Sequence, residues 1–410
     1  MKMLSVAEAK QRLLDQLAVC GVETIELKYS PGRVIAEDIV SDIASPRFDN
    51  SSMDGFAVQS ADLQTASDTE PVVLQVVGDI PAGTASDQAL RSGQAMRIMT
   101  GAALPPGADS VVPVEHTDAE FAKPGVEIPI NVQVKRAAKS GQFIRPAGED
   151  FKAGDKLIGV GTRIRAQEAG LLALLGKTQL SMFRKPRVAL LSSGDELLPP
   201  DQPLTAGKIR ETNSISLSAL VESCGAEPLF LGIARDNLQD ITIHLDKAID
   251  AGVDLILSSA GVSVGAFDFL REAVVKKGSM DFWKVNMRPG KPFSFGSYRD
   301  IPYIGLPGNP VSSFVGFEVF LRPALNKMAG VTNWSRLIIK STLKENVTSD
   351  GRESFLRVHL DSIGESLAVH LTGHQGSGNL YSLVQANALM RVPAGVTELS
   401  VGSQVEIWPL

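Results

Sequence analysis

Three basic residues, Lys284, Arg288 and Lys291, surround the turn Pro289-Gly290. If the segment before this turn is a β-strand, Lys284 and Arg288 share one face, because alternate strand residues point the same way. The Pro-Gly pair ends the strand, and Lys291 follows directly. The whole chain carries a formal net charge of −6. A local group of cations in an acidic protein indicates a specific anionic ligand and not a bulk polyanion.

Three carboxylates, Glu196, Asp236 and Asp268, each follow a strand-like segment. In an open parallel sheet, ligands bind beyond the carboxyl ends of the strands, so these side chains are expected at one edge. Magnesium typically takes one or two protein carboxylates together with phosphate oxygens and water. Each residue alone is equally well explained as a helix cap. The three together, beside the cations, favour a Mg²⁺ site.

Two glycine-containing loops accompany these charges, one from Gly261 to Gly265 and the other at Pro307-Gly308-Asn309-Pro310. Glycine lets the backbone approach a ligand closely, and loops before helices offer N–H groups to phosphate. Ser263 and Asn309 add side-chain donors. The alternative for each loop is an ordinary turn between strand and helix, and for the cations it is a solvated strand edge. The candidate substrate-binding residues here are Gly261, Ser263, Gly265, Pro307, Gly308, Asn309 and Pro310.

The elements that position these residues alternate between strand and helix from about 181 to 330, which predicts βαβ units, a mainly parallel sheet and right-handed crossovers. Short β-branched runs predict an inserted β-rich domain at 46–140, and strand-like alternation predicts a C-terminal β-barrel or sandwich at 331–410. Helices expected at 5–18 and 166–176 would pack together in a discontinuous domain formed by 1–45 and 141–180.

Composition limits the class of protein. A chain of 410 residues is long enough for several domains. With 40 basic and 46 acidic residues, non-specific nucleic-acid binding is not expected. Two distant cysteines, Cys20 and Cys224, make no disulfide framework. The first residues lack the apolar core of a signal peptide, and no stretch is apolar enough for a membrane span. These features predict a cytoplasmic protein that binds neither nucleic acid nor membrane.

In their order along the chain, these segments resemble the molybdopterin molybdenumtransferase family of the MoeA type, to which the E domain of gephyrin is related. The resemblance runs nearly from end to end. It is carried by Phe48–Ala57, Arg97–Gly101, Arg145–Asp150, Ser193–Glu196, Gly261–Gly265, Pro289–Pro292, Gly305–Pro310 and Gly373–Ser377. Each motif is moderately specific, and the ordered set is very specific.

The resemblance implies a multidomain α/β plus β fold, with a central α/β molybdopterin-binding domain, the inserted β-rich domain and a C-terminal β-barrel-like domain. It also implies an elongated homodimer of four-domain subunits. The implied reaction inserts molybdenum from molybdate into adenylylated molybdopterin, with Mg²⁺-dependent release of AMP, as the last common step of molybdenum cofactor biosynthesis. Further candidate partners are the molybdopterin adenylyltransferase and the acceptor molybdoenzymes.

The resemblance assigns roles by motif position. Asp54, Thr100 and Asp150 belong to the active cleft, part of which the other subunit supplies. The α/β wall of that cleft is formed by Glu196, Asp236, Asp268, Lys284, Arg288 and Lys291. Arg357 and Ser377, from the C-terminal domain, fall at further functional positions.

Two positions depart from the family pattern. Ala260 stands where many relatives have glycine, and Arg288 where some have lysine, which changes hydrogen-bond geometry but keeps the charge. Two other functions stay open. An adenylyltransferase acting on molybdopterin and ATP would need only the α/β domain, so the flanking domains argue against it. A non-catalytic scaffold of the gephyrin type is the second alternative.

Overall fold

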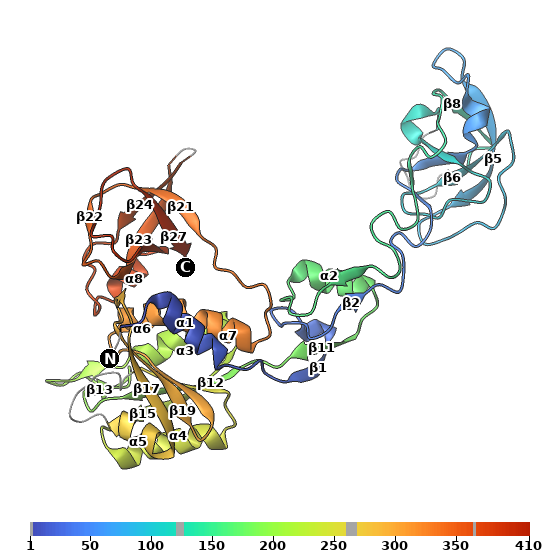
Figure 1. The fold of residues 1–410 in the computed structure, drawn as a ribbon. Coiled ribbons are helices and arrows are strands. Elements are labelled where there is room, and N and C mark those ends of the chain that lie inside the picture. The colour runs from blue at the N-terminus through green and yellow to red at the C-terminus, as the bar shows by residue number, and fades with distance from the viewer. Residues whose placement is uncertain (1–2, 120–126, 260–268, 364–365) are drawn as a thin grey trace. The chain divides into compact units, whose positions relative to one another are not determined.

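The computed structural model describes residues 3–119, 127–259, 269–363 and 366–410. The chain forms two compact units: the inserted unit, Asp38–Ile158, and the main unit, Met1–Glu37 with Gly159–Leu410 (Figure 1). Ala260, Asp268 and the loop from Gly261 to Gly265 lie outside the described residues. No helix of the described residues is long and apolar enough to cross a membrane.

The inserted unit is built on a five-stranded sheet with the order β7-β4-β6-β5-β8. Both faces of this sheet are covered: Phe56 and Val58 enter one core and Ala57 enters the other, as strand alternation requires. Its elements are β2 (Ile39–Val40), β3 (Asn50–Ser51), β4 (Gly55–Val58), η2 (Ser60–Leu63), β5 (Val72–Ile80), β6 (Gln94–Ile98), β7 (Ser110–Pro113), η3 (Val114–His116), β8 (Asn131–Val134), β9 (Ile144–Arg145) and β10 (Lys156–Ile158).

In the main unit, the N-terminal helix α1 (Val6–Asp15) begins at a capping box formed by Ser5 and Glu8. Its buried side chains Ala9 and Leu13 share a core with α7 (Arg322–Met328) and η4 (Phe317–Leu321). The expected packing of this helix on the helix at 166–176 is therefore wrong, because its apolar stripe is already used. That second helix, α2 (Ala166–Leu174), lies beside η1 (Leu27–Tyr29), near the pair β1 (Val22–Glu26) and β11 (Gln179–Phe183).

The centre of the main unit is a six-stranded sheet, the main sheet, with the order β15-β12-β16-β20-β19-β17. Neighbouring strands from β15 to β20 are parallel, whereas β19 is antiparallel to both of its neighbours. The strands are β12 (Arg187–Ser193), β15 (Glu227–Ala234), β16 (Leu255–Ser258), β17 (Gly278–Lys284), β19 (Pro292–Tyr298) and β20 (Ile301–Gly305), and a short pair is formed by β13 (Leu197–Leu198) and β14 (Ile209–Arg210).

Helices cover both faces of the main sheet. Val188 and Leu190 of β12 face the core with α1, α3 (Asn213–Ser223), α6 (Pro310–Gly316) and α7. Ala189 and Leu191 face the opposite core with α4 (Leu238–Asp250) and α5 (Phe269–Lys277). Near-continuous apolar strands are what a sheet buried on both faces requires.

The C-terminal part closes into a barrel of five strands in the ring order β23-β24-β21-β27-β25. A closed ring leaves no free strand edge inside it. The elements are β21 (Ile339–Leu343), β22 (Val347–Thr348), β23 (Glu353–Ile363), β24 (Ser366–Leu371), α8 (Tyr381–Val384), β25 (Ala388–Val392), β26 (Glu398–Leu399) and β27 (Gln404–Pro409). The barrel contributes Phe355 and Leu389 to the core shared with the main sheet.

The segment around Pro289 differs from its prediction. Strand β17 ends at Lys284, and the chain then leaves the main sheet to form β18 (Met287–Arg288), which pairs with β23 of the barrel. It returns at Lys291, whose carbonyl accepts the Val285 N–H at 2.9 Å. Lys284 and Arg288 therefore do not share one strand face, because they belong to strands of two different sheets.

Candidate functional site

One edge of the main sheet, the carboxyl edge, gathers residues that are far apart in the sequence. Because β12, β15, β16, β20 and β17 run in the same direction, their carboxyl ends meet there, together with the start of β19. Glu196 follows β12, Asp236 follows β15, and Gly308 follows β20, while Lys284 and Lys291 lie at the ends of β17 and β19. The strand directions thus bring five of the expected site residues to one edge.

The acidic corner of this edge comprises Asp195, Glu196 and Asp236. The Asp236 N–H donates to Asp195 Oδ1 at 3.2 Å, and the Asp195 N–H donates to Asp236 Oδ2 at 3.4 Å. Partial desolvation and the negative charges of Asp195 and Glu196 raise the pKa of Asp236, against the opposing effect of the Asp195 N–H. A cation at this corner would relieve that repulsion.

The chemistry of the acidic corner fits Mg²⁺ only as a shared site. Among the described residues, no group of three or more His, Cys, Asp or Glu side chains is arranged to hold a metal ion. A hard cation needs only one or two protein carboxylates when substrate oxygens and water complete its shell. The Glu196 carboxylate lies against Gly194, where a Cβ would be 2.7 Å from Glu196 Oε2.

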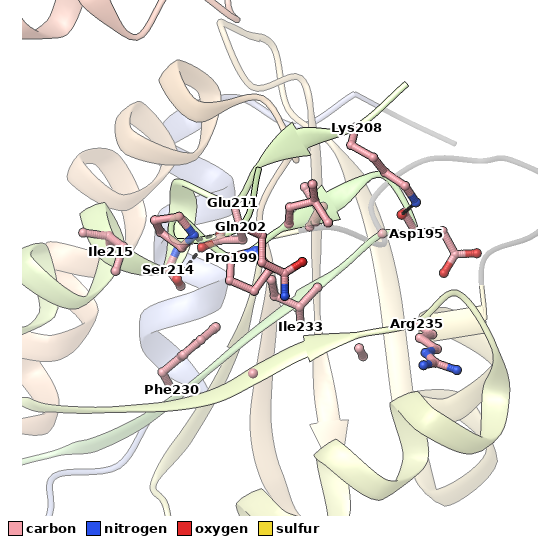
Figure 2. A pocket seen from close by; sticks show the side chains of 16 residues that line it. Asp195, Pro199, Gln202, Lys208, Glu211, Ser214, Ile215, Phe230, Ile233 and Arg235 are labelled. Atoms are coloured by element: carbon pink, nitrogen blue, oxygen red, sulfur yellow. Dashed lines mark hydrogen bonds between the residues drawn. The ribbon is translucent and has the colours of Figure 1, made fainter. Parts of the chain in front are cut away.

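A pocket of about 730 Å³ opens beside the acidic corner, between β15, α3 and the β13–β14 pair (Figure 2). Phe230 and Ile233 form part of an apolar wall, and Asp195, Lys208 and Arg235 supply charge. The Lys208 ammonium donates to the backbone carbonyl of Asp195, which ties the β14 side of the pocket to the corner. An apolar wall with a few polar groups is the usual lining of a small-molecule site.

The basic group comprises Lys284, Arg288, Lys291 and Arg357. Lys284 and Lys291 are exposed and form no ion pair with the described residues. Arg288 Nη1 lies 4.0 Å from Asp350 Oδ2, a distance that leaves most of its positive charge available.

Arg357 on β23 is fully buried and has no carboxylate partner among the described residues. Its Nε donates to Ser382 Oγ at 3.0 Å and its Nη2 donates to the Gly376 carbonyl at 3.1 Å, but its buried Nη1 has no acceptor. Burial and the positive charge of Arg288 lower the pKa of Arg357 to about 10. A buried guanidinium that lacks an acceptor is what an anion-binding site presents before its ligand arrives.

The barrel meets the carboxyl edge through Ser377. Asn309 Nδ2 donates to Ser377 Oγ at 3.1 Å, and the Val311 N–H donates to the Ser377 carbonyl at 3.1 Å. Pro307, Gly308, Asn309 and Pro310 thus form a loop fixed on one side by the barrel. On the other side, Asn213 Nδ2 donates to the Gly308 carbonyl at 2.7 Å.

The inserted unit carries the other three expected residues. Asp54 Oδ1 accepts from the N–H and from the hydroxyl of Thr100, each at 2.7 Å, so the structure pairs these two residues. Gly55 is required next to Asp54, because a Cβ there would lie 2.0 Å from the Val112 carbonyl oxygen. Asp150 is held separately, by Arg145 Nη2 at 2.9 Å and by Ser45 Oγ at 3.1 Å.

Sequence reasoning missed several residues of the edge. Asp195 was named only as part of a polar segment, although its carboxylate contacts the Asp236 backbone. Lys208, Glu211 and Asn213 were not predicted as site residues, since they fall in or next to a polar stretch that carries no recognisable motif. The signal that could have found Asp195 was its position directly before Glu196, at the end of a buried strand.

Fold and site together define a multidomain α/β protein whose main sheet presents an edge suited to an anionic, phosphate-bearing ligand. Three family models match the chain. The MoeA N-terminal region (domain I and II) matches residues 4–176, the probable molybdopterin binding domain matches 189–327, and the MoeA C-terminal region (domain IV) matches 340–410.

Full-length relatives agree with these matches. A molybdopterin molybdenumtransferase from Nostoc sp. is 37% identical over 395 residues, which cover 95% of this chain and 88% of that protein. Molybdopterin molybdenumtransferase 2 from Mycobacterium tuberculosis is 38% identical over 419 residues, covering 100% of both chains. The crystal structure of the molybdopterin biosynthesis moeA protein from Pyrococcus horikoshii OT3 superposes with a TM-score of 0.84 at 30% identity, over 100% of both chains.

The chain therefore belongs to the MoeA family of molybdopterin molybdenumtransferases. The resemblance read from the ordered motifs and the predicted fold class, α/β with a mainly parallel sheet plus β domains, are both confirmed.

Proposed function

We propose that this protein inserts molybdenum from molybdate into adenylylated molybdopterin and that AMP is released in a Mg²⁺-dependent step. Family membership makes it a molybdenumtransferase of cofactor biosynthesis. The roles of individual residues are inferred from the geometry of the carboxyl edge and of the basic group.

The observation that carries the proposal is the buried guanidinium of Arg357, whose Nη1 has no acceptor. Molybdate is a dianion with four oxygens, and it can accept hydrogen bonds from a guanidinium and from a hydroxyl at once. Ser377 and Arg288 supply the neighbouring hydroxyl and positive charge. In this assignment, Arg357, Arg288 and Ser377 hold the oxyanion, and Lys284 and Lys291 neutralise the substrate's phosphates.

The acidic corner is assigned to Mg²⁺, with Glu196 and Asp236 as ligands and Asp268 as a further candidate. The ion, when bound, supplies charge neutralisation at the pyrophosphate and at the AMP leaving group. The chain's own residues bind and orient: the Pro307–Pro310 loop offers backbone groups, with Gly308 and Asn309 at its centre. Gly261, Ser263 and Gly265 are proposed to extend this cradle. The reaction needs no protein nucleophile, and none is proposed.

The inserted unit is assigned to the same cleft through Asp54, Thr100 and Asp150. We propose that the active protein is a homodimer, in which the inserted unit of one subunit completes the cleft of the other. We also propose four domains, formed by 1–45 with 141–180, 46–140, 181–330 and 331–410. Sedimentation of the purified chain tests the dimer, and a monomer with full activity would contradict the shared cleft.

The decisive experiment supplies the purified chain with adenylylated molybdopterin, Mg²⁺ and molybdate, and measures both AMP release and molybdenum incorporation. We expect AMP release to require molybdate and Mg²⁺ and to match incorporation one for one. AMP release that ignores molybdate would refute the proposal. A parallel reaction with molybdopterin and ATP tests the adenylyltransferase alternative, for which adenylylated product would be the positive result.

A further inference from the structure

Glu211 is a buried carboxylate at the foot of helix α3, with an exposed fraction of 4%. No lysine or arginine of the described residues pairs with it. A buried charge without a counter-ion is costly unless its oxygens are fully hydrogen-bonded. Glu211 is hydrogen-bonded in this way, and its partners lie on the elements that form the carboxyl edge.

One part of its role is local. Glu211 Oε1 accepts from the Ser214 N–H at 2.8 Å, and Oε2 accepts from the Ser214 hydroxyl. Thr212, at the N-cap position of α3, makes no side-chain capping bond. Glu211 therefore caps the helix in its place.

The other part reaches across the main sheet. The Ser192 hydroxyl donates to Glu211 Oε1 at 3.0 Å, and Ser192 Oγ lies 3.1 Å from Ser259 Oγ. Ser192 is at the end of β12, directly before the turn that carries Asp195 and Glu196, and Ser259 directly follows β16. This chain of contacts joins the ends of two neighbouring parallel strands, β12 and β16.

The start of α3 is also hydrogen-bonded to the loop that follows β20. Asn213, two residues after Glu211, is buried and donates to the Gly308 carbonyl at 2.7 Å. Glu211 and Asn213, at the start of α3, are thereby bonded to the ends of β12 and β20 and, through Ser192, to the end of β16. All three of these ends carry groups assigned to substrate or metal in the proposed function.

We propose that Glu211 is a positioning residue of the molybdenum insertion reaction, which acts through Ser192 to set the relative placement of the strand ends at the carboxyl edge. This inference rests on the proposed function. Glu211 lines the pocket beside the acidic corner, but each of its oxygens already accepts a hydrogen bond from a serine group, so the proposed role acts through Ser192 and not through contact with the substrate. Its effect on the reaction comes from hydrogen-bond geometry, and small displacements of catalytic groups have large effects on rate.

A helix cap alone would explain the Ser214 contacts but not the Ser192 contact, and Ser192→Ala separates the two. It removes the link to Ser259 and leaves the cap intact. The matched control is Ser294→Ala, a fully buried serine of β19 whose hydroxyl has no partner. Glu211→Gln is the conservative variant: its amide oxygen can accept from Ser192 and from the Ser214 N–H, while the Ser214 hydroxyl can rotate to accept from the amide.

The test measures kcat and KM for molybdate-dependent AMP release, together with the thermal midpoint, for the full-length chain. We expect Ser192→Ala to lower kcat about tenfold with little change in KM. The kcat of Ser294→Ala and of Glu211→Gln should stay within about threefold of the kcat of the unmodified chain. A threefold change corresponds to less free energy than one hydrogen bond typically contributes. If Ser192→Ala and Ser294→Ala have the same kcat, the inference is overturned, and Glu211 acts only as a helix cap.

A second readout does not depend on the reaction. Amide hydrogen exchange at residues 192–196 should be faster in Ser192→Ala than in Ser294→Ala at equal thermal midpoints. If the unmodified chain releases no AMP, the proposed function fails and this exchange measurement still decides whether Ser192 orders the strand end. Equal exchange in the two variants would overturn the positioning role.

Discussion

The acidic corner and the two lysines of the basic group lie at the same edge of the main sheet, but the two groups are assembled in different ways. Asp195, Glu196 and Asp236 follow two adjacent parallel strands, and partial burial together with the two neighbouring charges raises the pKa of Asp236. The basic group comes from strands β17, β18, β19 and β23, which belong to two different sheets. The acidic corner therefore needs only the main sheet, whereas the basic group also needs the barrel to be docked.

The largest expected effect on the reaction rate comes from Arg357, which the barrel contributes to the basic group. Arg357→Gln should lower the rate of molybdate-dependent AMP release by about 10²- to 10³-fold, because a preorganised buried donor is lost. Arg357→Lys should be intermediate, since lysine keeps the charge but not the two-pronged geometry. The control is Arg391→Gln, an arginine of β25 paired with Glu353 and Glu406. Initial rates across molybdate concentrations measure the effect, and an unchanged molybdate KM and kcat would remove Arg357 from the oxyanion site.

Glu318, whose charge is balanced by two arginines, has a lowered pKa, in contrast to the raised pKa of Asp236. Glu318 is buried, which raises its pKa, but Arg322 and Arg336 prevail and hold the pKa below the ordinary 4.5. Its contribution to stability is thus fully present above pH 4.5 and is lost as the pH falls through the lower folded-state value. Glu318→Gln should reduce the free energy of unfolding at pH 7 by about 3 kcal/mol, because two guanidinium groups lose their partner.

Urea unfolding at pH 7, 4.5 and 3 checks this expectation. The variant should show a shallower loss of stability toward pH 3 than the unmodified chain. Glu222→Gln, at an exposed position of α3, serves as the control and should leave both curves unchanged. Parallel acid profiles for Glu318→Gln and the unmodified chain would contradict the assigned pKa direction.

Substitutions in the acidic corner should alter the dependence on Mg²⁺ alone. Glu196→Gln or Asp236→Asn is expected to raise the half-saturating Mg²⁺ concentration by about tenfold, because the ion loses its interaction with one carboxylate. The molybdate KM should not change. Glu227→Gln, at the opposite end of β15 from Asp236, is the matched control. A titration with Mg²⁺ at saturating molybdate separates the two parameters, and a shift in molybdate KM instead would mean that the corner binds no metal.

The smallest effect is expected for the exposed cations. Lys284→Ala or Lys291→Ala should raise the KM for the anionic substrates about fivefold, the scale of one exposed charge contact, with the fold intact and the Mg²⁺ dependence unchanged. Added salt should reduce the difference from the unmodified chain. Lys276→Ala, near the end of α5 and at the opposite end of β17 from Lys284, is the control. Equal KM values for all three variants would exclude these lysines from anion binding.

The sequence predicted the carboxyl edge because parallel strands impose it. Once Glu196 and Asp236 are seen to follow buried strands, their meeting is a property of strand direction alone. The family resemblance assigned Asp54 and Thr100 to one cleft but did not predict their hydrogen bonds, since nothing in their spacing indicates contact.

Other features could not be predicted, for physical reasons. Arg288 was placed on the strand of Lys284 because alternation continues through Asn286, but sheet membership depends on a distant partner, β23. Glu211 carries no periodic signal, and its importance depends on Ser192 and Asn213, which only the tertiary fold brings near Gly308 and Ser259. α1 was placed on the wrong partner because an apolar stripe shows that a helix packs but not on what.

The excursion of the chain from Lys284 to Lys291 has a mechanical consequence. Both ends of this short segment are anchored in the main sheet, and its middle is anchored in the barrel by β18. Any rotation of the barrel against the sheet would pull on the one stretch of backbone that carries Lys284, Arg288 and Lys291. Anion affinity in this protein should therefore respond to barrel substitutions that contact no ligand, because a change in the orientation of the barrel would move the backbone that carries these three cations.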